Sequence, residues 1–447
     1  MTADMVSELL EQKQFTHLYT LLKEMRAEDI APLFENLEPT DAVRLFRLLP
    51  KTLAADTFVE LDATQQEDLI ARFSDRELKA VLDDMFVDDT VDVIEEMPAN
   101  VVKRIIQQSD EETRQSINEI LDYPKDSAGS IMTTEFVSLH PDFTVTDAFA
   151  RIRQTGVEKE TIYTCYVTDS NRHLLGVVSV LKLLLAEWDT TLRELMDTHV
   201  ISVSTHDDKE IAANRLNKYG FMALPVVDGE NRLVGIVTFD DAIDVLTEEA
   251  TEDIEKMAAI VPTDKPYMRT GIFETFRKRI PWLLLLMISA TFTGAIISHF
   301  EETIAAIVGG SVLIAFIPML MDTGGNCGSQ SATLIIRGIA LDEIRFTDLF
   351  KVMFKEFRIS LIVGAFLAVA NGVRIFIQYH NPGLAVVIAC SLMGTVIMAK
   401  LVGCTLPLLA KKVNLDPAIM ASPLITTLVD TFSILIYFNI ATVLFRL

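Results

Sequence analysis

Apolar residues recur every 12 positions between residues 34 and 97 of the chain. Each unit has one apolar residue, a second one three positions later, and then a turn such as EPT, PKT or SDR. An i, i+3 pair of this kind predicts a short helix of about two turns. Because so short a helix can bury its apolar face only against its neighbours, the repeat predicts a stacked α-helical superhelix. The two apolar series are Phe34, Phe46, Phe58, Ile70, Leu82 and Ile94, and Leu37, Leu49, Leu61, Phe73, Met85 and Met97.

A second repeat follows, with a period of about 60 residues. IMTTEFVSLHPDFTVTDAFARIR is answered by LMDTHVISVSTHDDKEIAANRLN, and YVTDSNRHLLGVVSVLKLL is answered by PVVDGENRLVGIVTFDDAIDVL. Each copy alternates extended apolar stretches with amphipathic helices, which predicts a β-α-β-β-α unit. The pair resembles tandem CBS domains, small modules that often bind adenine nucleotides. The resemblance implies an ATP-type site in the second copy at Phe221, Thr238 and Asp241, whereas the first copy has Lys182 where that Asp would fall.

The chain beyond residue 270 is predominantly apolar, and five segments are long enough to cross a membrane. Lys and Arg are concentrated before the first segment, between the second and third, and before the fifth. The positive-inside rule then predicts a cytosolic N-terminus and an outside C-terminus. The N-terminus also lacks the pattern of a secretory signal. The predicted spans are residues 281–300, 304–326, 359–379, 383–410 and 417–446.

Charge separates the two parts of the chain. Residues 1–270 contain 53 acidic and 26 basic residues, whereas residues 271–447 contain 10 acidic and 13 basic residues. An acidic surface attracts cations and repels nucleic acid, so we expect no nucleic-acid partner. Acidic residues gather in two helical stretches, 83–96 and 241–255. Taken by itself, each stretch is typical of a solvated helix face. Two such stretches beside a membrane domain favour cation binding.

Polar residues inside the predicted spans are the candidate site. Asp430 lies in an apolar run, where a charge is costly unless it faces water, a partner or an ion. The alternative is a neutral acid that hydrogen-bonds a neighbouring helix. Pro423 is expected to interrupt the same span near Thr426 and Thr427, and Pro318 with Gly324–Gly325 is expected to break the second span beside Asn326 and Gln330. Close helix packing is the alternative role of these glycines.

Oxygen atoms dominate the predicted membrane site. Carboxylate, hydroxyl, amide and carbonyl oxygens suit a hard, strongly hydrated cation such as Mg²⁺, whereas Zn²⁺ and Cu⁺ call for His or Cys. Cys327, Cys390 and Cys404 lack metal-ligand spacing and read as small packing residues. The sequence has no P-loop or other catalytic motif, which predicts that the protein is not an enzyme.

The whole chain resembles the MgtE family of magnesium channels. The motifs that carry the resemblance are KRIPWL, PMLMDTGGNCGSQSATLIIRG and DPAIMASPLITTLVDT. The resemblance implies a homodimer whose pore lies between the second and fifth spans of both subunits. It places the pore acid at Asp430, a backbone-carbonyl ligand at Thr426 and an acid of the cytosolic pore mouth at Asp416. The implied Mg²⁺-sensing acids are Asp88, Asp92, Asp241, Asp244, Glu249, Glu252 and Asp253. Ser422 and Ser433 depart from the family pattern next to the pore.

The predicted fold class is a multidomain membrane protein with an α-superhelical N domain, an α/β tandem CBS pair, a connecting helix and a five-helix transmembrane domain. The expected function is a plasma-membrane Mg²⁺ channel closed by cytosolic Mg²⁺, with Mn²⁺, Co²⁺ and Ni²⁺ as further candidate ions and membrane lipid as a partner. The rivals are a secondary carrier coupled to H⁺ or Na⁺, and a membrane anchor for a nucleotide-sensing module. The predicted domains are residues 1–128, 129–188, 189–246, 247–270 and 271–447.

Overall fold

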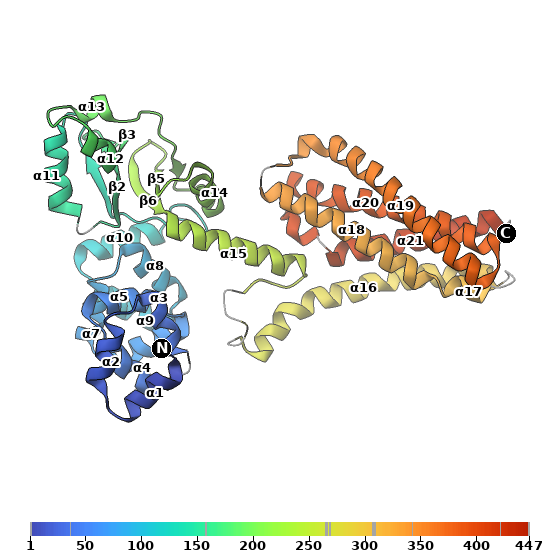
Figure 1. The fold of residues 1–447 in the computed structure, drawn as a ribbon, viewed down its shortest axis with the longest axis horizontal. Coiled ribbons are helices and arrows are strands. Elements are labelled where there is room, and N and C mark those ends of the chain that lie inside the picture. The colour runs from blue at the N-terminus through green and yellow to red at the C-terminus, as the bar shows by residue number, and fades with distance from the viewer. Residues whose placement is uncertain are drawn as a thin grey trace. The chain divides into compact units, whose positions relative to one another are not determined.

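The computed structural model describes the chain except residues 1, 36, 157–158, 264–266, 268–269, 306–309, 342, 421 and 446–447. The described residues form two compact units, Met1–Thr247 and Glu248–Leu447. Figure 1 shows both units and labels most of their helices and strands. Each unit is described by itself.

The first unit begins with short stacked helices, as the 12-residue repeat predicts. Every member of the two apolar series is buried or half-buried, including Phe58 at 0% exposed. The rings of Phe46, Phe58 and Phe73 pack together, with centroids 5.1 to 6.4 Å apart. The superhelix is therefore confirmed. Its helices are α1 (Ala3–Glu11), α2 (Phe15–Leu22), α3 (Ala27–Ile30), η1 (Ala31–Phe34), α4 (Pro39–Phe46), α5 (Lys51–Val59), α6 (Ala63–Arg72), α7 (Asp75–Leu82), α8 (Val87–Glu96), α9 (Ala99–Gln108) and α10 (Glu111–Leu121).

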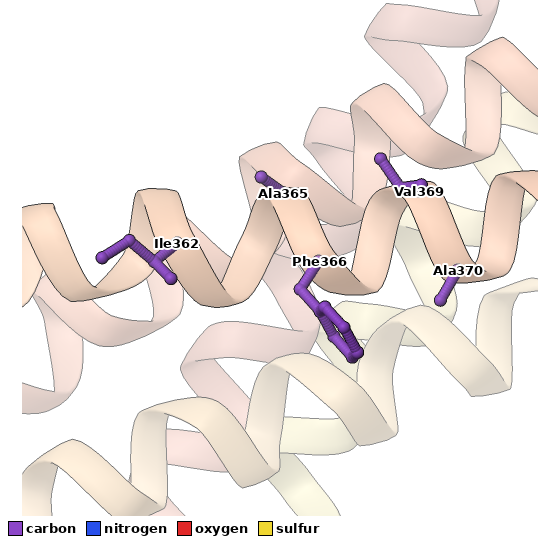
Figure 2. A pocket seen from close by; sticks show the side chains of 5 residues that line it. All are labelled: Ile362, Ala365, Phe366, Val369 and Ala370. Atoms are coloured by element: carbon purple, nitrogen blue, oxygen red, sulfur yellow. The ribbon is translucent and has the colours of Figure 1, made fainter.

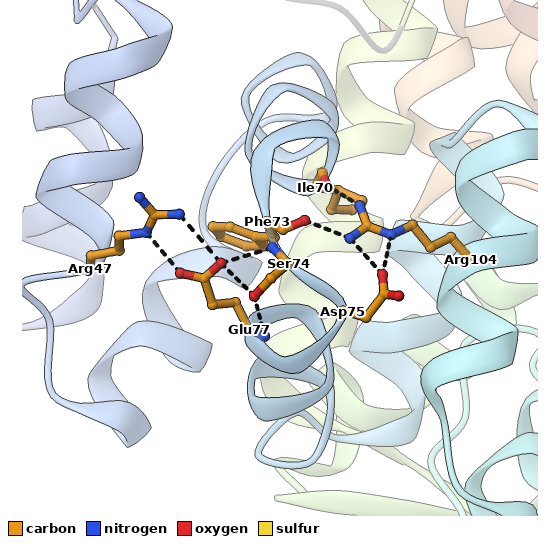
Figure 3. Close-up of polar contacts among 7 residues, drawn as sticks. All are labelled: Arg47, Ile70, Phe73, Ser74, Asp75, Glu77 and Arg104. Carbon is orange, nitrogen blue, oxygen red and sulfur yellow. Dashed lines mark hydrogen bonds and ion pairs between the residues drawn. The ribbon is translucent and has the colours of Figure 1, made fainter.

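Polar contacts join helices of this stack that are not consecutive in sequence (Figure 3). Arg47, at the end of α4, pairs with Glu77 of α7, with 2.8 Å between Nε and Oε1. Arg104 of α9 pairs with Asp75 at the start of α7 at 2.9 Å. The same guanidinium donates hydrogen bonds to two backbone carbonyl groups at the end of α6. The contacts connect helices that are two or three positions apart along the chain, and the bonded residues are 29 to 34 residues apart in sequence.

Two similar α/β domains complete the first unit. In each domain the first strand is parallel to the second, and the second is antiparallel to the third. Both follow the predicted β-α-β-β-α order. The first contains β1 (Phe136–Leu139), α11 (Val145–Thr155), β2 (Thr161–Thr168), β3 (Leu174–Ser179) and α12 (Val180–Leu185). The second, which follows the short α13 (Leu192–Leu195), contains β4 (Val203–Ser204), α14 (Lys209–Tyr219), β5 (Ala223–Val227), β6 (Leu233–Thr238) and α15 (Phe239–Met257).

Helix α15 joins the end of the second CBS domain to the first part of the predicted connecting helix. It begins directly after β6 and continues without a break to Met257. The predicted boundary between residues 246 and 247 therefore falls inside a helix, because the acidic and apolar spacing is continuous across it.

The second unit begins inside α15, at Glu248, and continues with long helices. Four described segments are long and apolar enough to cross a membrane: Ile272–Phe300, Phe346–Tyr379, Pro382–Lys412 and Pro417–Phe445. They correspond to the predicted first, third, fourth and fifth spans, and the count of five spans stays a prediction. The helices are α16 (Ile272–Ala305), α17 (Gly310–Ile314), α18 (Ile317–Ala340), α19 (Leu349–Tyr379), α20 (Pro382–Lys412) and α21 (Ser422–Phe445), with 3-10 turns η3 (Phe346–Asp348) and η4 (Pro417–Met420).

Helix α18 corrects the prediction for the second span. The predicted span 304–326 includes residues 306–309, which lie outside the described residues. The helix begins at Ile317 and runs unbroken through Gly324 and Gly325 to Ala340. Pro318 stands in its first turn, where a missing N–H costs no helical hydrogen bond. The predicted break at the glycines is therefore wrong.

The glycines of α18 allow close contact with its neighbours instead. A Cβ at Gly324 would lie 2.8 Å from Val429, and one at Gly328 would lie 2.8 Å from Ile425, both on α21. On α20, a Cβ at Gly403 would overlap the carbonyl oxygen of Gly328. Only residues without a side chain fit where helix backbones touch. The packing alternative for this stretch is thus the one that the geometry supports.

One face of α19 is apolar and open (Figure 2). Ile362, Phe366 and Val369 are 74%, 75% and 67% exposed, and together with Ala365 and Ala370 they line a shallow hollow. A contiguous apolar face of this kind is typical of contact with lipid or with another apolar surface.

Candidate functional site

A polar stripe runs along the otherwise largely apolar helix α18. Asp322, Asn326 and Gln330 are all exposed, and their spacing of four residues places them on one face of the helix. The Asn326 side-chain amide donates a hydrogen bond to the Asp322 carboxylate at 3.2 Å. Carboxylate and amide groups are costly against lipid, so this face requires water, an ion or another protein surface.

Helix α21 brings Asp430 to the same level as Asp322. Three glycines of α18 meet three residues of α21, and the α18 numbers fall as the α21 numbers rise, so the helices are antiparallel. Their contacts are Gly328 with Ile425, Gly325 with Thr426, and Gly324 with Val429. Asp322 and Asp430 lie only two residues and one residue, respectively, beyond the contact of Gly324 with Val429, and the two carboxylates interact electrostatically. Asp430 is half-buried.

The start of α21 differs from its prediction. Pro423 occupies the first turn of α21 and does not interrupt the helix. Its carbonyl oxygen accepts hydrogen bonds from the hydroxyl groups of Thr426 and Thr427, both at 2.9 Å. The Pro423 carbonyl is therefore satisfied within the helix, although both threonine oxygens keep lone pairs. The Ser422 side chain lies outside the described residues, and Ser433 is buried and donates a hydrogen bond to the carbonyl of Val429.

The membrane site offers oxygen atoms from two helices of one chain. Among the residues that the structure describes, no three His, Cys, Asp or Glu side chains are arranged to hold a metal ion. Mg²⁺ loses its bound water reluctantly and is usually held by one or two carboxylates. A site with only a few protein oxygens around a hydrated ion therefore suits Mg²⁺.

Asp416, the predicted acid of the cytosolic pore mouth, is engaged by a lysine. Lys256, in the last turn of α15, lies 2.6 Å from Asp416 and 2.6 Å from Glu252. The Asp416 carboxylate also accepts a hydrogen bond from the backbone N–H of Ala418, at the start of η4. This ion pair fixes the end of α15 to the turn that precedes α21.

A second acidic site lies inside the first unit. Asp88 is only 8% exposed, and its Oδ1 has no hydrogen-bond partner among the residues that the structure describes. Burial, followed by the nearby charges of Asp241 and Asp89, raises the pKa of Asp88 well above its usual value. Burial and the charge of Asp241 also raise the pKa of Asp89 to about 7, and burial and the charge of Asp89 raise the pKa of Glu160 to about 8.

The crowding of these groups has a simple chemical meaning. Buried like charges disfavour the ionised state of each carboxyl group. Burial raises the pKa of Asp241 to about 6, although a hydrogen bond from the Thr238 hydroxyl opposes the shift. Glu135, whose carboxylate accepts a hydrogen bond from the backbone N–H of Val87, adds a further negative charge. A bound proton or a cation would relieve the repulsion. We call Asp88, Asp89, Glu135, Glu160, Asp240 and Asp241 the cytosolic acid cluster.

The other predicted residues are placed as follows. Asp92 and Asp244 are exposed on α8 and α15, one turn beyond Asp88 and Asp241. Glu249 and Asp253 are half-buried on α15. In the predicted nucleotide site, Thr238 is buried beside Asp241, and the ring of Phe221 stacks on Tyr219 at 5.5 Å.

The sequence reading missed several of these groups. Asp322 stands in the apolar run IPMLMDTGG, and this signal is the same as the one that identified Asp430. Glu135 and Glu160 are isolated in sequence and join the cytosolic acid cluster only through folding. Lys400 and Glu356 form a buried charge pair. Both were visible in the sequence as charges, Lys400 inside the fourth predicted span and Glu356 just before the third.

Three family profiles match consecutive parts of the chain. The MgtE intracellular N domain matches residues 25–126, and the CBS domain matches residues 128–189 and 192–248. The MgtE divalent cation transporter profile matches residues 317–440, which include α18 and most of α21.

Curated relatives extend over the full length. The magnesium transporter MgtE of Thermus thermophilus is 34% identical and covers 98% of this chain and 97% of its own. That of Bacillus subtilis is 33% identical and covers 98% of this chain and 99% of its own. A crystal structure of the cytosolic domain of the Mg²⁺ channel MgtE in complex with ATP aligns with a TM-score of 0.52 at 32% identity, over 54% of this chain and 99% of that one.

A further solved structure, the soluble part of a magnesium transporter, gives a TM-score of 0.51 at 31% identity over 56% of this chain and 98% of that one. The N domain and CBS pair predicted from the repeats are thereby confirmed. MgtE proteins are transporters, so the expectation that the chain is not an enzyme is also confirmed. Because its relatives match it from end to end, the chain belongs to the MgtE family of magnesium transporters.

Proposed function

We propose that the protein is an ion channel that carries Mg²⁺ through a path lined by α18 and α21. The observation that carries the proposal is the exposed stripe of Asp322, Asn326 and Gln330 at the level of Asp430, within apolar helices. A hydrated divalent cation is the partner that these oxygens suit. A potential of 100 mV, inside negative, supplies about 4.6 kcal/mol to drive such an ion inward.

We further propose that two copies of the chain enclose this path. In a single chain the polar stripe is exposed and Asp430 only half-buried, which would place charged groups against lipid. A second copy related by twofold symmetry would cover the stripe with the same surface. Asp430, Thr426, Asn326, Gln330 and Ser422 would then surround the ion from both sides. The membrane is the plasma membrane, with the N-terminus in the cytosol and the C-terminus outside.

Cytosolic Mg²⁺ would close the channel through the acidic residues. Within the cytosolic acid cluster, burial followed by neighbouring negative charges raises the pKa values of Asp88, Asp89 and Glu160. A bound divalent cation would replace the missing positive charge. Asp92, Asp244, Glu249, Glu252 and Asp253 would contribute further oxygens along α8 and α15.

The CBS pair would bind ATP next to Thr238 and Asp241. The support is the similarity to a cytosolic domain crystallised with ATP, together with the Thr238 hydroxyl and the Asp241 carboxylate at the start of α15. Calorimetric titration of the purified protein with ATP should show binding that Asp241→Ala removes.

Transport by purified protein in liposomes tests the main proposal. Mg²⁺ uptake by the wild-type protein should respond to an imposed potential, and Asp430→Asn should abolish it, since the change removes the charge and keeps the shape. Asp348→Asn, at the half-buried start of α19, is the matched control and should transport normally. Single-channel currents would distinguish a channel from a carrier coupled to H⁺ or Na⁺. Normal uptake by Asp430→Asn would contradict the proposal, and no ion flux at all would favour a membrane anchor.

A further inference from the structure

A charged pair is buried between three helices of the second unit. Lys400 of α20 and Glu356 of α19 are each 6% exposed, and Nζ lies 3.6 Å from Oε2. Ser331 of α18 joins the pair: its hydroxyl donates a hydrogen bond to Glu356 at 2.7 Å and accepts one from Lys400 at 3.1 Å. Three residues far apart in sequence thus form one buried polar contact.

Burying such a charged pair costs free energy, so its presence suggests a functional role. Taking an ammonium group and a carboxylate out of water costs several kcal/mol per ion, and apolar residues of similar size often stabilise a fold as well or better. Inside membrane helices, ionisable residues are rare and mark functional positions by default. Neither residue belongs to the polar stripe.

The position of Ser331 on α18 indicates what the buried pair does. Ser331 follows Asp322 by nine residues, which at 3.6 residues per turn places it about 180° around the helix. The buried contact therefore holds the back of α18 while the polar stripe occupies the front. Near it, the backbones of Gly328 and Gly403 touch, and a surface without side chains offers little resistance to rotation or sliding.

We infer that Lys400 and Glu356 are positioning residues, which fix the rotation of α18 through Ser331 so that Asp322, Asn326 and Gln330 face the ion path. The inference rests on the proposed function for the identity of that path. The pair supplies the directional contact that the glycine surfaces lack. Its net charge of zero leaves the field of Asp322 and Asp430 along the path unopposed.

A thiol reporter on the stripe tests this inference. Gln330→Cys is introduced where the exposed native Cys390 is replaced by Ala, since the other native cysteines are buried. A membrane-impermeant methanethiosulfonate reagent should modify the reporter in the otherwise unaltered protein. Adding Lys400→Met with Glu356→Gln, which removes both charges and keeps the volumes, should slow modification about tenfold because α18 turns. Without the reporter, the same double variant should lower Mg²⁺ uptake by a similar factor.

The controls separate positioning from stability. Lys351→Met with Asp348→Asn removes an exposed pair of the same kind, 3.0 Å apart, and should change neither rate. Unchanged modification and uptake in a folded Lys400→Met and Glu356→Gln variant would overturn the inference. If that variant fails to fold, Ser331→Ala is tested by the same two measurements, because it removes only the hydrogen bonds that join the pair to α18. If the unaltered protein transports no Mg²⁺, the proposed function fails, while the modification rates still test the positioning.

Discussion

At the scale of single residues, two intramembrane carboxylates dominate the chemistry of the second unit. Asp430 and Asp322 come from different helices, and the glycine contacts of α18 bring them to one level. Each accepts a cation only if its charge is retained, and two adjacent charges attract a divalent ion more strongly than a monovalent one. The second carboxylate would therefore favour Mg²⁺ over Na⁺ or K⁺.

Asp322→Asn should weaken Mg²⁺ transport without abolishing it. The change keeps the shape and can keep a hydrogen bond with Asn326, but it removes half of the acidic charge that each chain contributes. We expect the Mg²⁺ concentration for half-maximal uptake to rise about tenfold, which corresponds to the loss of about 1.4 kcal/mol of interaction. Asp322→Glu, which keeps the charge, should remain near the wild type. Equal kinetics for the wild type and Asp322→Asn would remove Asp322 from the path.

The cytosolic acid cluster leads to a prediction about pH. Because the folded-state pKa values of Asp89 and Glu160 are raised to about 7 and about 8, the folded state holds protons that the unfolded chain has already released. The free energy of unfolding should therefore fall as the pH rises from about 4 to about 8 in the absence of divalent ions. Thermal unfolding of the full chain in a chelator should show this decline.

Mg²⁺ should reverse the decline, since it competes with protons for the same carboxylates. We expect the rise in unfolding temperature on adding Mg²⁺ to be larger near pH 8 than near pH 6. Asp89→Asn with Glu160→Gln should flatten both dependences. A wild-type unfolding temperature that is independent of pH and of Mg²⁺ would mean that the cluster does not bind the ion.

At the scale of helices, the second unit depends on where glycine replaces a side chain. Helix α18 contacts α20 and α21 through Gly324, Gly325 and Gly328. On α20, Gly403 lies against the backbone of Gly328. These positions set the distances between backbones and hence the width of any path beside them. The helical register of Asp322 against Asp430 follows from the same contacts.

Gly403→Ala should destabilise the second unit. Its Cβ would overlap the carbonyl of Gly328, which is backbone and cannot move aside alone. Overpacking of this kind typically costs about 1–3 kcal/mol. Gly372→Ala on α19 is the matched control, because a Cβ there would lie 3.5 Å from Ala389, an ordinary contact. Thermal unfolding in detergent should separate the two variants, and equal unfolding temperatures would contradict this account of the helix crossing.

At the scale of the whole molecule, the acidic first unit and the membrane helices would be coupled by Mg²⁺. With little Mg²⁺ in the cytosol, the proposed gate would open because the carboxylates of residues 88–96 and of residues 241–255 would repel one another. Bound ions would offset the repulsion and favour the closed form. Moving an equilibrium from mostly open to mostly closed needs about 5.5 kcal/mol of differential binding, which several weak carboxylate sites supply together.

Neutralising Asp88, Asp92, Asp241 and Glu252 together should therefore give channels that respond poorly to internal Mg²⁺. In the wild type, millimolar Mg²⁺ should protect the cytosolic part from protease, as expected for carboxylate sites of modest affinity. The quadruple Asn/Gln variant should lose this protection while still conducting. Protection that remains unchanged in the variant would place the gate elsewhere.

The sequence alone determined the features that depend on local spacing. The stacked short helices and the two β-α-β-β-α units followed from periodicity, because a short element shows its buried face in its own pattern. Four of the apolar spans followed from the length of their apolar runs. Asp430 was found for the same reason, since one charge in an apolar run is visible without a fold. The break predicted at Gly324–Gly325 was wrong because glycine serves both kinks and close packing, and only the neighbouring helices distinguish the two.

Tertiary structure decided everything that joins distant positions. Ser331, Glu356 and Lys400 lie on three helices, and no spacing rule connects them. Asp88 and Glu160 share one buried cluster only because the superhelix packs against the CBS pair. Which face of a helix turns inward depends on the partners that cover it. The sequence identified candidate carboxylates, but packing decided which groups surround them and therefore whether they are charged.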